Sequence, residues 1–339
     1  MKAVEHIGPR EVRVVERAEL EPGPGEVRVA MRVGGLCGSD LHRYRKAPSD
    51  RMHNVLGHEP CGVVDRLGAG VTRPAIGDRV SVYHYAGCGY CEWCRRGEIH
   101  WCEDKRVPGW HTCGSCGTQV VIKAEMALPL PEGMSFEQGA IVACGGSTTW
   151  GALTKVRPTT EDAAVVWGLG PIGLSGVAML KAFGSRVVAV GRRRSRLELA
   201  RDFGADEVID IDRTPEAGET IRRMLPRGAS LAYETSGTAQ AQRQMIDTLG
   251  PFGRAVCVGL GSNEPAINLG RITGKQMTLY GSHVMNLGEY DAMLRFLQYH
   301  DLHLDRMITH ALPYDRGAEA FEVADRGDCG KVVLVADDA

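Results

Sequence analysis

Four closely spaced cysteines constrain this chain more than any other feature of its sequence. Cys88, Cys91, Cys94 and Cys102 follow the pattern C-x2-C-x2-C-x7-C, which can bring four thiolates to one tetrahedral metal ion, most naturally zinc. Ferredoxin-like iron–sulfur ligation is the alternative, but the proline that usually follows the last cysteine is missing. Because four thiolates leave no open coordination position, we expect a structural zinc lobe over residues 88–102.

Length and charge indicate the number of domains and the kinds of partner that this chain can have. The chain has 339 residues, eleven cysteines and a net charge of −2, so we expect two domains and no general attraction to nucleic acid. No apolar run approaches the roughly 20 residues that cross a bilayer, so no membrane association is expected. The first residues lack a signal peptide's apolar core. Together with cysteines clustered as metal thiolates rather than disulfides, this predicts a cytoplasmic protein.

The first 150 residues are typical of a compact β-rich domain. Val27, Val29, Met31 and Val33 alternate with more polar positions, which predicts a half-buried strand. Further short strands are predicted at the valine-rich runs 62–64, 79–82 and 119–122.

From residue 151 onward, strand-like and helix-like segments alternate, as in the βαβ units of a parallel sheet. A helix is predicted over 172–183 and another from Ser195, where Ser195 and Glu198 have the spacing of a capping box. The tail contains a helix-like segment, 290–299, and a last strand over 331–334, and is predicted to return to the first domain. Strands are predicted at 163–167, 186–190, 207–210, 231–234, 255–258 and 277–280.

A second set of metal-binding residue types is spread along the chain. Cys37, His58 and Cys144 offer two sulfurs and one nitrogen, and with one open position such a set describes a catalytic rather than a structural zinc. Taken singly, each is weak evidence, because a lone histidine is usually packed in a core and a lone cysteine usually behaves as a small apolar residue.

The order of these motifs resembles the zinc-dependent medium-chain dehydrogenase/reductase family, the alcohol dehydrogenase-like enzymes, over essentially the whole chain. The resemblance rests on Cys37-Gly-Ser-Asp-Leu-His42, Gly57-His58-Glu59, the four-cysteine lobe, Cys144 and a glycine-rich turn. It implies an α/β fold, with a GroES-like β-rich catalytic domain over 1–150 and 285–339. A Rossmann doubly wound parallel-sheet domain over 151–284 would bind the cofactor.

The resemblance also implies roles at the reactive metal. Cys37, His58 and Cys144 would hold a second zinc, with Glu59 as an alternative ligand when the coordination changes. Asp40 would orient the imidazole of His58. The remaining position would take the substrate oxygen, and zinc would act as a Lewis acid on it.

A proton relay follows from the same resemblance. Ser39 would take the hydroxyl proton of the substrate and pass it through the cofactor ribose to His42, which exchanges protons with solvent.

The cofactor motif G-x-G-x-x-G lies between a predicted strand and a predicted helix. Its glycines allow a tight turn and a close backbone approach, and the helix N-terminus favours a pyrophosphate. Thr148, which follows Cys144, is predicted to bind the cofactor as well. The motif residues are Gly168, Gly170, Pro171, Ile172 and Gly173.

The end of the second predicted strand favours NADP(H) over NAD(H). An NAD site usually carries Asp or Glu there, about 20 residues after the first glycines. This chain has Gly191 followed by Arg192, Arg193 and Arg194, and guanidinium groups can bind a 2′-phosphate through charge-assisted hydrogen bonds. We predict that Arg192 and then Arg193 make these bonds. The alternatives are a solvated helix start or a nucleic-acid patch.

The substrate is predicted less sharply. By position, His84, Tyr85, Trp110, Leu260 and His283 would surround the reacting oxygen. Several are polar, so we expect a polyol, a sugar-derived alcohol or an amino alcohol, with a simple aliphatic or aromatic alcohol as the alternative.

Two other functions compete with this one. A zinc-free quinone or enone reductase would leave the second metal set without a purpose. A non-catalytic, NADPH-binding redox sensor could use Cys113 and Cys116, but no thioredoxin-like βαβ unit surrounds that pair. The family resemblance implies a small-molecule substrate and a homotetramer or homodimer in contact through the cofactor-domain sheets.

Overall fold

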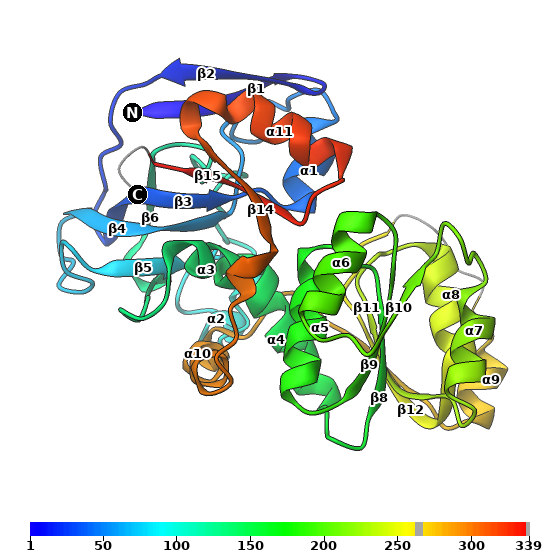
Figure 1. Cartoon of the computed structure of the whole chain (residues 1–339). Helices are drawn as coiled ribbons and strands as arrows, with labels where there is room; N and C mark the ends of the chain where they lie inside the picture. The colour runs from blue at the N-terminus through cyan, green and yellow to red at the C-terminus, as the bar shows by residue number, and fades with distance from the viewer. Residues whose placement is uncertain (262–266, 337–339) are drawn as a thin grey trace. The chain divides into compact units, whose positions relative to one another are not determined.

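The computed structural model describes residues 1–261 and 267–336, which divide into two compact units. Unit 1 comprises Met1–Cys144, Asn286–Gly288 and the chain from Ile308 onward, and unit 2 comprises Gly145–Met285 and Glu289–Met307. The α/β fold predicted from the sequence is confirmed: unit 1 is β-rich and unit 2 is built around a parallel sheet (Figure 1).

The division differs from the expected one at residues 289–307, which were predicted to lie with the first domain. They lie in unit 2 because helix α10 (Tyr290–Tyr299) packs there through its apolar face. The ring of Phe296 lies 4.5 Å from that of Phe183 and 5.2 Å from that of Trp150. The first boundary also comes earlier than residue 150, directly after Cys144.

Unit 1 contains a mainly antiparallel sheet in the order β14-β15-β3-β4-β5-β7, with β6 also paired to β3, and a β1-β2 hairpin. Every strand predicted in this part of the sequence lies within one of these strands. The bounds are β1 Lys2–Gly8, β2 Glu11–Glu16, β3 Glu26–Gly35, β4 Glu59–Leu67, β5 Arg79–Val82, β6 Gln119–Lys123, β7 Ala127–Pro129, β14 Ile308–Pro313 and β15 Lys331–Val335.

Two helices of unit 1 pack on its strands: α3 contacts β3, β4 and β5, and α11 contacts β14 and β15. Helix α11 contacts β2 and β15, and its buried Phe321 packs against Tyr44 of α1 with ring centroids 5.0 Å apart. This packing fixes α1, which carries several predicted site residues. The bounds are α1 Gly38–Tyr44, α2 Glu92–Arg95, α3 Phe136–Ile141 and α11 Gly317–Arg326.

Unit 2 is a six-stranded parallel sheet in the order β10-β9-β8-β11-β12-β13, the doubly wound arrangement predicted for a cofactor domain. Helices cover both faces, with α5 and α6 on one side and α7 and α8 on the other (Figure 1). The strands are β8 Ala163–Trp167, β9 Arg186–Gly191, β10 Glu207–Asp210, β11 Ala229–Glu234, β12 Leu249–Cys257 and β13 Thr278–Gly281. The other helices are α4 Ser147–Val156, α5 Pro171–Ala182, α6 Arg194–Asp202, α7 Ala217–Met224, α8 Ala239–Thr248 and α9 Leu269–Gly274.

The predicted capping box at Ser195 is wrong. Helix α6 begins at Arg194, its N-cap is Arg193, and no side chain caps it. Ser195 is already helical, so it does not have the extended backbone that an N-cap requires. Glu198 instead pairs with Arg194, one turn earlier.

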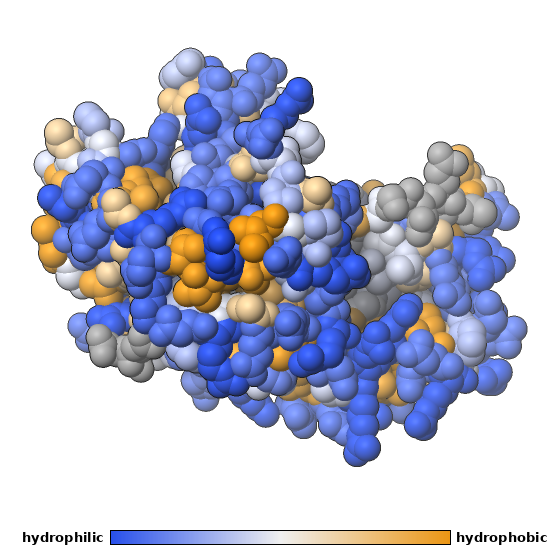
Figure 2. Space-filling view, turned by 90° about the horizontal axis from the view of Figure 1, so that it is seen from above, coloured by the Kyte–Doolittle hydropathy of each residue, from blue (hydrophilic) through white to orange (hydrophobic). Residues whose placement is uncertain are grey.

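The surface offers no sign of a membrane span: in the described part of the chain, no helix is both long and apolar enough to cross a bilayer. Figure 2 shows a mostly hydrophilic face with separate small apolar patches.

Candidate metal centres and cofactor site

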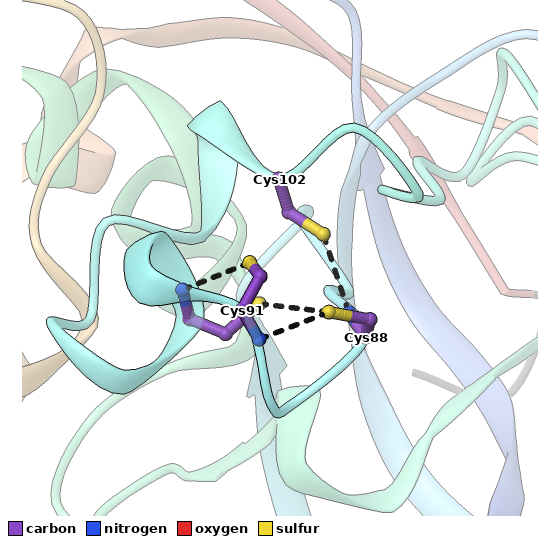
Figure 3. A group of neighbouring side chains, drawn as sticks. Cys88, Cys91 and Cys102 are labelled. Atoms are coloured by element: carbon purple, nitrogen blue, oxygen red, sulfur yellow. Dashed lines mark hydrogen bonds between the residues drawn. The ribbon is translucent and has the colours of Figure 1, made fainter.

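The four-cysteine lobe gathers its sulfur atoms as its spacing predicts. Their Sγ atoms all lie within 4.8 Å of one another, and those of Cys88 and Cys94 are 3.9 Å apart. Zinc–sulfur bonds of about 2.3 Å in a tetrahedron place sulfurs about 3.8 Å apart, so the cluster has the right size for zinc. The sulfurs of Cys88, Cys91 and Cys102 point toward a common centre in Figure 3.

Backbone amides prepare this lobe for a cation. The N–H of Cys91 donates to Sγ of Cys88 at 3.4 Å, and the N–H of Cys88 donates to Sγ of Cys102 at 3.4 Å. The backbone amides of Tyr90 and Cys91 lower the pKa of Cys88 to about 7. Such bonds favour thiolates, the form that binds metal.

A second cluster joins residues that are far apart in sequence, all within unit 1. Ligand atoms of Cys37, His58, Glu59 and Cys144 lie within 4.8 Å of one another. Cys37 is the N-cap of α1, and His58 and Glu59 stand where β4 begins. Cys144 lies in η3 (Val142–Gly146), a π-helical turn between α3 and α4. Such turns are frequent at functional sites.

Asp40 supports two of these ligands. Its side chain is fully buried; Oδ1 lies 3.1 Å from Nδ1 of His58, and Oδ2 accepts the backbone N–H of Cys37 at 2.9 Å. If Nδ1 of His58 donates its proton to Asp40, then Nε2 is left with a lone pair for a metal ion.

Burial and neighbouring groups shift the pKa values of the side chains in this cluster. A hydrogen bond from Cys144, aided by His58, holds the pKa of Cys37 well below its usual range despite burial. The same hydrogen bond and burial raise the pKa of Cys144. Burial opposes protonation of His58, but Asp40 and Cys37 outweigh it and raise the pKa of His58. This buried donor set of two sulfurs, an imidazole and a nearby carboxylate fits zinc.

Lys331 belongs to this region, although it lies in none of the motifs recognised in the sequence. Its ammonium group forms an ion pair with Oε2 of Glu59, and both side chains are almost fully buried. Burial raises the pKa of Glu59, and the charge of Lys331 opposes that rise. A lysine in the first position of an apolar run usually marks an exposed strand end, so sequence pattern alone hides this contact.

The predicted relay residues share one exposed face of α1. Ser39 and His42 are both exposed, while Asp40 and Tyr44 face the interior of unit 1. Residues three apart lie side by side on a helix, so the two side chains are neighbours close to Cys37, the N-cap of the same helix.

Three of the five predicted substrate residues line the metal cluster. The ring centroid of His58 lies 5.1 Å from that of His84 and 4.9 Å from that of Trp110, and His84 lies 4.7 Å from Tyr85. Nδ1 of His84 lies 2.8 Å from the carbonyl oxygen of Ala143. The other two predicted residues, Leu260 and His283, are exposed residues of unit 2.

The glycine-rich turn in unit 2 connects β8 to α5, as predicted. Gly170 is the N-cap of α5 and Pro171 its first residue. A Cβ atom at Gly173 would lie 1.9 Å from the carbonyl oxygen of Gly168, so the turn requires glycine there. Thr148 is buried in the first turn of α4, and the hydroxyl of its neighbour Thr149 donates to the carbonyl of Ile172 at 3.0 Å.

Packing at the end of β9 explains why residue 191 is glycine and not the Asp or Glu of a typical NAD site. A Cβ atom at Gly191 would lie 2.6 Å from Cγ of Leu169, so packing against the glycine-rich turn already excludes an acidic side chain. The NADP prediction therefore depends on the arginines. Arg194 pairs with Glu198 at 2.7 Å, whereas Arg192 and Arg193 have no ion pair within the described ranges and remain available for a phosphate.

Cys113 and Cys116 lie in the core of unit 1. Both are buried, free thiols. Burial raises the pKa of Cys113 to about 12 and raises the pKa of Cys116 well above its usual range. Reactive thiols have lowered pKa values and some exposure, and Cys113 and Cys116 have neither.

Comparison with known proteins matches both units to described families. Residues 23–132 match "Alcohol dehydrogenase GroES-like domain" and residues 171–299 match "Zinc-binding dehydrogenase". The chain is 32% identical to L-threonine 3-dehydrogenase of Pyrococcus horikoshii, covering 95% of this chain and 94% of that protein. It is 30% identical to 2-dehydro-3-deoxy-L-galactonate 5-dehydrogenase of Pseudoalteromonas atlantica, covering 99% and 98%.

Among solved structures, an alcohol dehydrogenase (RspB) from Escherichia coli CFT073, complexed with the cofactor NADH, has a TM-score of 0.90. It is 29% identical and covers 99% of both chains.

Proposed function

Because this chain belongs to the zinc-dependent medium-chain dehydrogenase/reductase family, we propose that it transfers hydride between NADP(H) and a polar secondary alcohol or its ketone. The observation that carries the proposal is the buried cluster of Cys37, His58 and Cys144, with ligand atoms within 4.8 Å and Glu59 alongside. When bound, zinc supplies a Lewis acid for the substrate oxygen and the nicotinamide ring exchanges the hydride.

In this proposal, each residue of the chain has a defined task. Cys37, His58 and Cys144 hold the metal, and Asp40 keeps Cys37 and His58 in place. Ser39 takes the proton of the substrate hydroxyl, and His42 on the same exposed face releases it to solvent. The four thiolates of the lobe hold a second, structural zinc.

Cofactor choice is assigned to Arg192 and Arg193. Their guanidinium groups follow the strand that ends beside the glycine-rich turn, where a dinucleotide's adenosine ribose is bound in such folds. The RspB structure contains NADH, so the preference for NADP(H) is a proposal about this chain's own arginines. The other cofactor contacts are assigned to Gly168, Gly170, Pro171, Ile172, Gly173 and Thr148.

The substrate is proposed to be a polyol, a sugar-derived alcohol or an amino alcohol. His84, Tyr85 and Trp110 place polar and aromatic groups beside the metal cluster, which suits hydroxyl or amino groups better than a hydrocarbon. Two relatives are named for a sugar acid and for threonine.

The proposal also includes a cytoplasmic location and a homodimer or homotetramer. None of the eleven cysteines, all of which lie in the described ranges, forms a disulfide, which suits the reducing cytoplasm. Strand β13 is the last strand of its sheet and all four of its residues are exposed. Pairing of β13 with a second copy would give a homodimer or homotetramer, and light scattering after size exclusion measures which.

The proposal is tested by metal analysis and a substrate panel. We expect two zincs per chain, and NADPH absorbance changes with polyols, sugar alcohols, amino alcohols or their ketones. One zinc per chain, or turnover confined to simple aliphatic and aromatic alcohols, would contradict the metal or the substrate assignment respectively.

A further inference from the structure

Lys331 of β15 and Glu59 of β4 form an ion pair although strand β3 lies between their strands. Gly35 of β3 lies opposite Glu59 of β4 on one side and opposite Val333 of β15 on the other. Lys331 is two residues before Val333 and therefore points to the same face of the sheet. A Cβ atom at Gly35 would lie 1.9 Å from Oε2 of Glu59. The absence of a side chain at Gly35 thus makes room for the ion pair.

The ion pair competes with the metal for the same carboxylate. Glu59 has a carboxylate oxygen within 4.8 Å of the ligand atoms of Cys37, His58 and Cys144, and carboxylates are good zinc ligands. A buried carboxylate without a partner is strongly unfavourable. Inside this cluster, Glu59 therefore has two favourable arrangements: bound to the metal, or paired with Lys331. The structure shows the second.

Lys331 is buried together with its partner Glu59. Its side chain is 2% exposed, so it cannot serve solubility, and a buried lysine is rare without a partner. Its ammonium group forms an ion pair with Oε2 of Glu59, whose carboxylate belongs to the metal cluster.

We propose that Lys331 is a positioning residue that keeps the Glu59 carboxylate beside the metal but off it, so that the fourth coordination position stays open to the substrate. This inference rests on the proposed reactive metal site. It assigns to Lys331 the control of metal coordination, because a fourth protein ligand would turn an open site into a closed one.

The test replaces the reactive metal of the full-length protein with Co²⁺ and records its visible absorption spectrum and its release to a chelator. In Lys331→Met, Glu59 becomes the fourth ligand, so the Co²⁺ spectrum changes and release slows about tenfold. A merely structural role predicts the opposite, faster release. Lys331→Arg keeps the charge and should behave as the wild type, and so should the double variant Lys331→Met/Glu59→Gln, which removes both charges.

Each outcome has one meaning. A wild-type protein that takes up no Co²⁺ outside the four-cysteine lobe contradicts the proposed metal site itself. Co²⁺ uptake with an unchanged spectrum and unchanged release in Lys331→Met overturns the role of Lys331. If Lys331→Met does not fold, Gly35→Ala provides the second variant, since its added Cβ displaces the Glu59 carboxylate without removing a charge. It should show the same spectral change, and an unchanged spectrum would overturn the inference.

Discussion

Nδ1 of His58 lies 3.1 Å from Oδ1 of Asp40, and the other oxygen of the same carboxylate accepts the backbone N–H of Cys37 at 2.9 Å. One buried side chain therefore orients the ring of one proposed metal ligand and the backbone of another. Asp40 comes from the first turn of α1, only three residues after Cys37. Asp40 thereby connects the first turn of α1 to His58, which directly precedes β4.

This relationship predicts the effect of Asp40→Asn. The amide keeps the size of the side chain but has only one acceptor oxygen, so it cannot accept from both His58 and Cys37. We expect zinc affinity at the reactive site to fall about 10- to 100-fold. Dialysis against a chelator followed by metal analysis should show one zinc per chain lost and the lobe zinc retained. Equal retention of both zincs by the variant and the wild type would show that Asp40 does not support the ligands.

Removal of the Ser39 hydroxyl should slow turnover without loss of metal. Proton transfer by a positioned side chain contributes about 100-fold or more, so Ser39→Ala should lower kcat by a similar factor while zinc content stays at two. Ser39→Thr keeps the hydroxyl and is the matched control. Steady-state kinetics with unchanged kcat in Ser39→Ala would rule out the relay.

The three arginines after β9 should differ in their effect on cofactor choice. A charge-assisted hydrogen bond contributes about 1.5–3 kcal/mol, so Arg192→Ala should raise KM for NADP(H) about ten- to a hundredfold and leave KM for NAD(H) unchanged. Arg194→Ala is the control, because Arg194 pairs with Glu198 and its side chain is 92% exposed. Equal effects of both variants on the NADP/NAD ratio would contradict the assignment.

An acidic side chain cannot simply be added at Gly191 to complement this test. Its Cβ would collide with Leu169, so Gly191→Asp requires the companion change Leu169→Ala. The pair of changes should raise the use of NAD(H), as measured by kcat/KM with each cofactor.

The four-cysteine lobe should lose its zinc independently of the reactive site. Cys102→Ser replaces a thiolate by a weaker ligand, so we expect one zinc per chain and a Tm lower by several degrees, since a structural zinc contributes directly to folding. Cys257→Ser changes a cysteine outside both clusters and is the control. A Cys102→Ser protein with two zincs and an unchanged Tm would contradict a structural metal at the lobe.

The features that depend on short spacing could be predicted from the sequence. The C-x2-C-x2-C pattern, the glycine turn between a strand and a helix, and the alternation of apolar residues all concern neighbours in the chain, and local backbone geometry converts such spacing directly into structure. The six strands of the parallel sheet and the placement of Ser39 and His42 on one helix face belong to this group. Through the family resemblance, the sequence also indicated that Cys37, His58 and Cys144 come together.

The features that depend on packing between distant segments became visible only in the folded structure. The contact between Lys331 and Glu59 requires the register of β15, β3 and β4 and the missing side chain of Gly35. Gly191 resembles a cofactor signal in the sequence, but Leu169 packs against it. Residues 289–307 belong to unit 2 because aromatic rings meet there. No sequence motif indicates these contacts, because long segments of chain separate the strands and helices that make them. Side-chain volume and charge determine which residues become neighbours only when the chain folds.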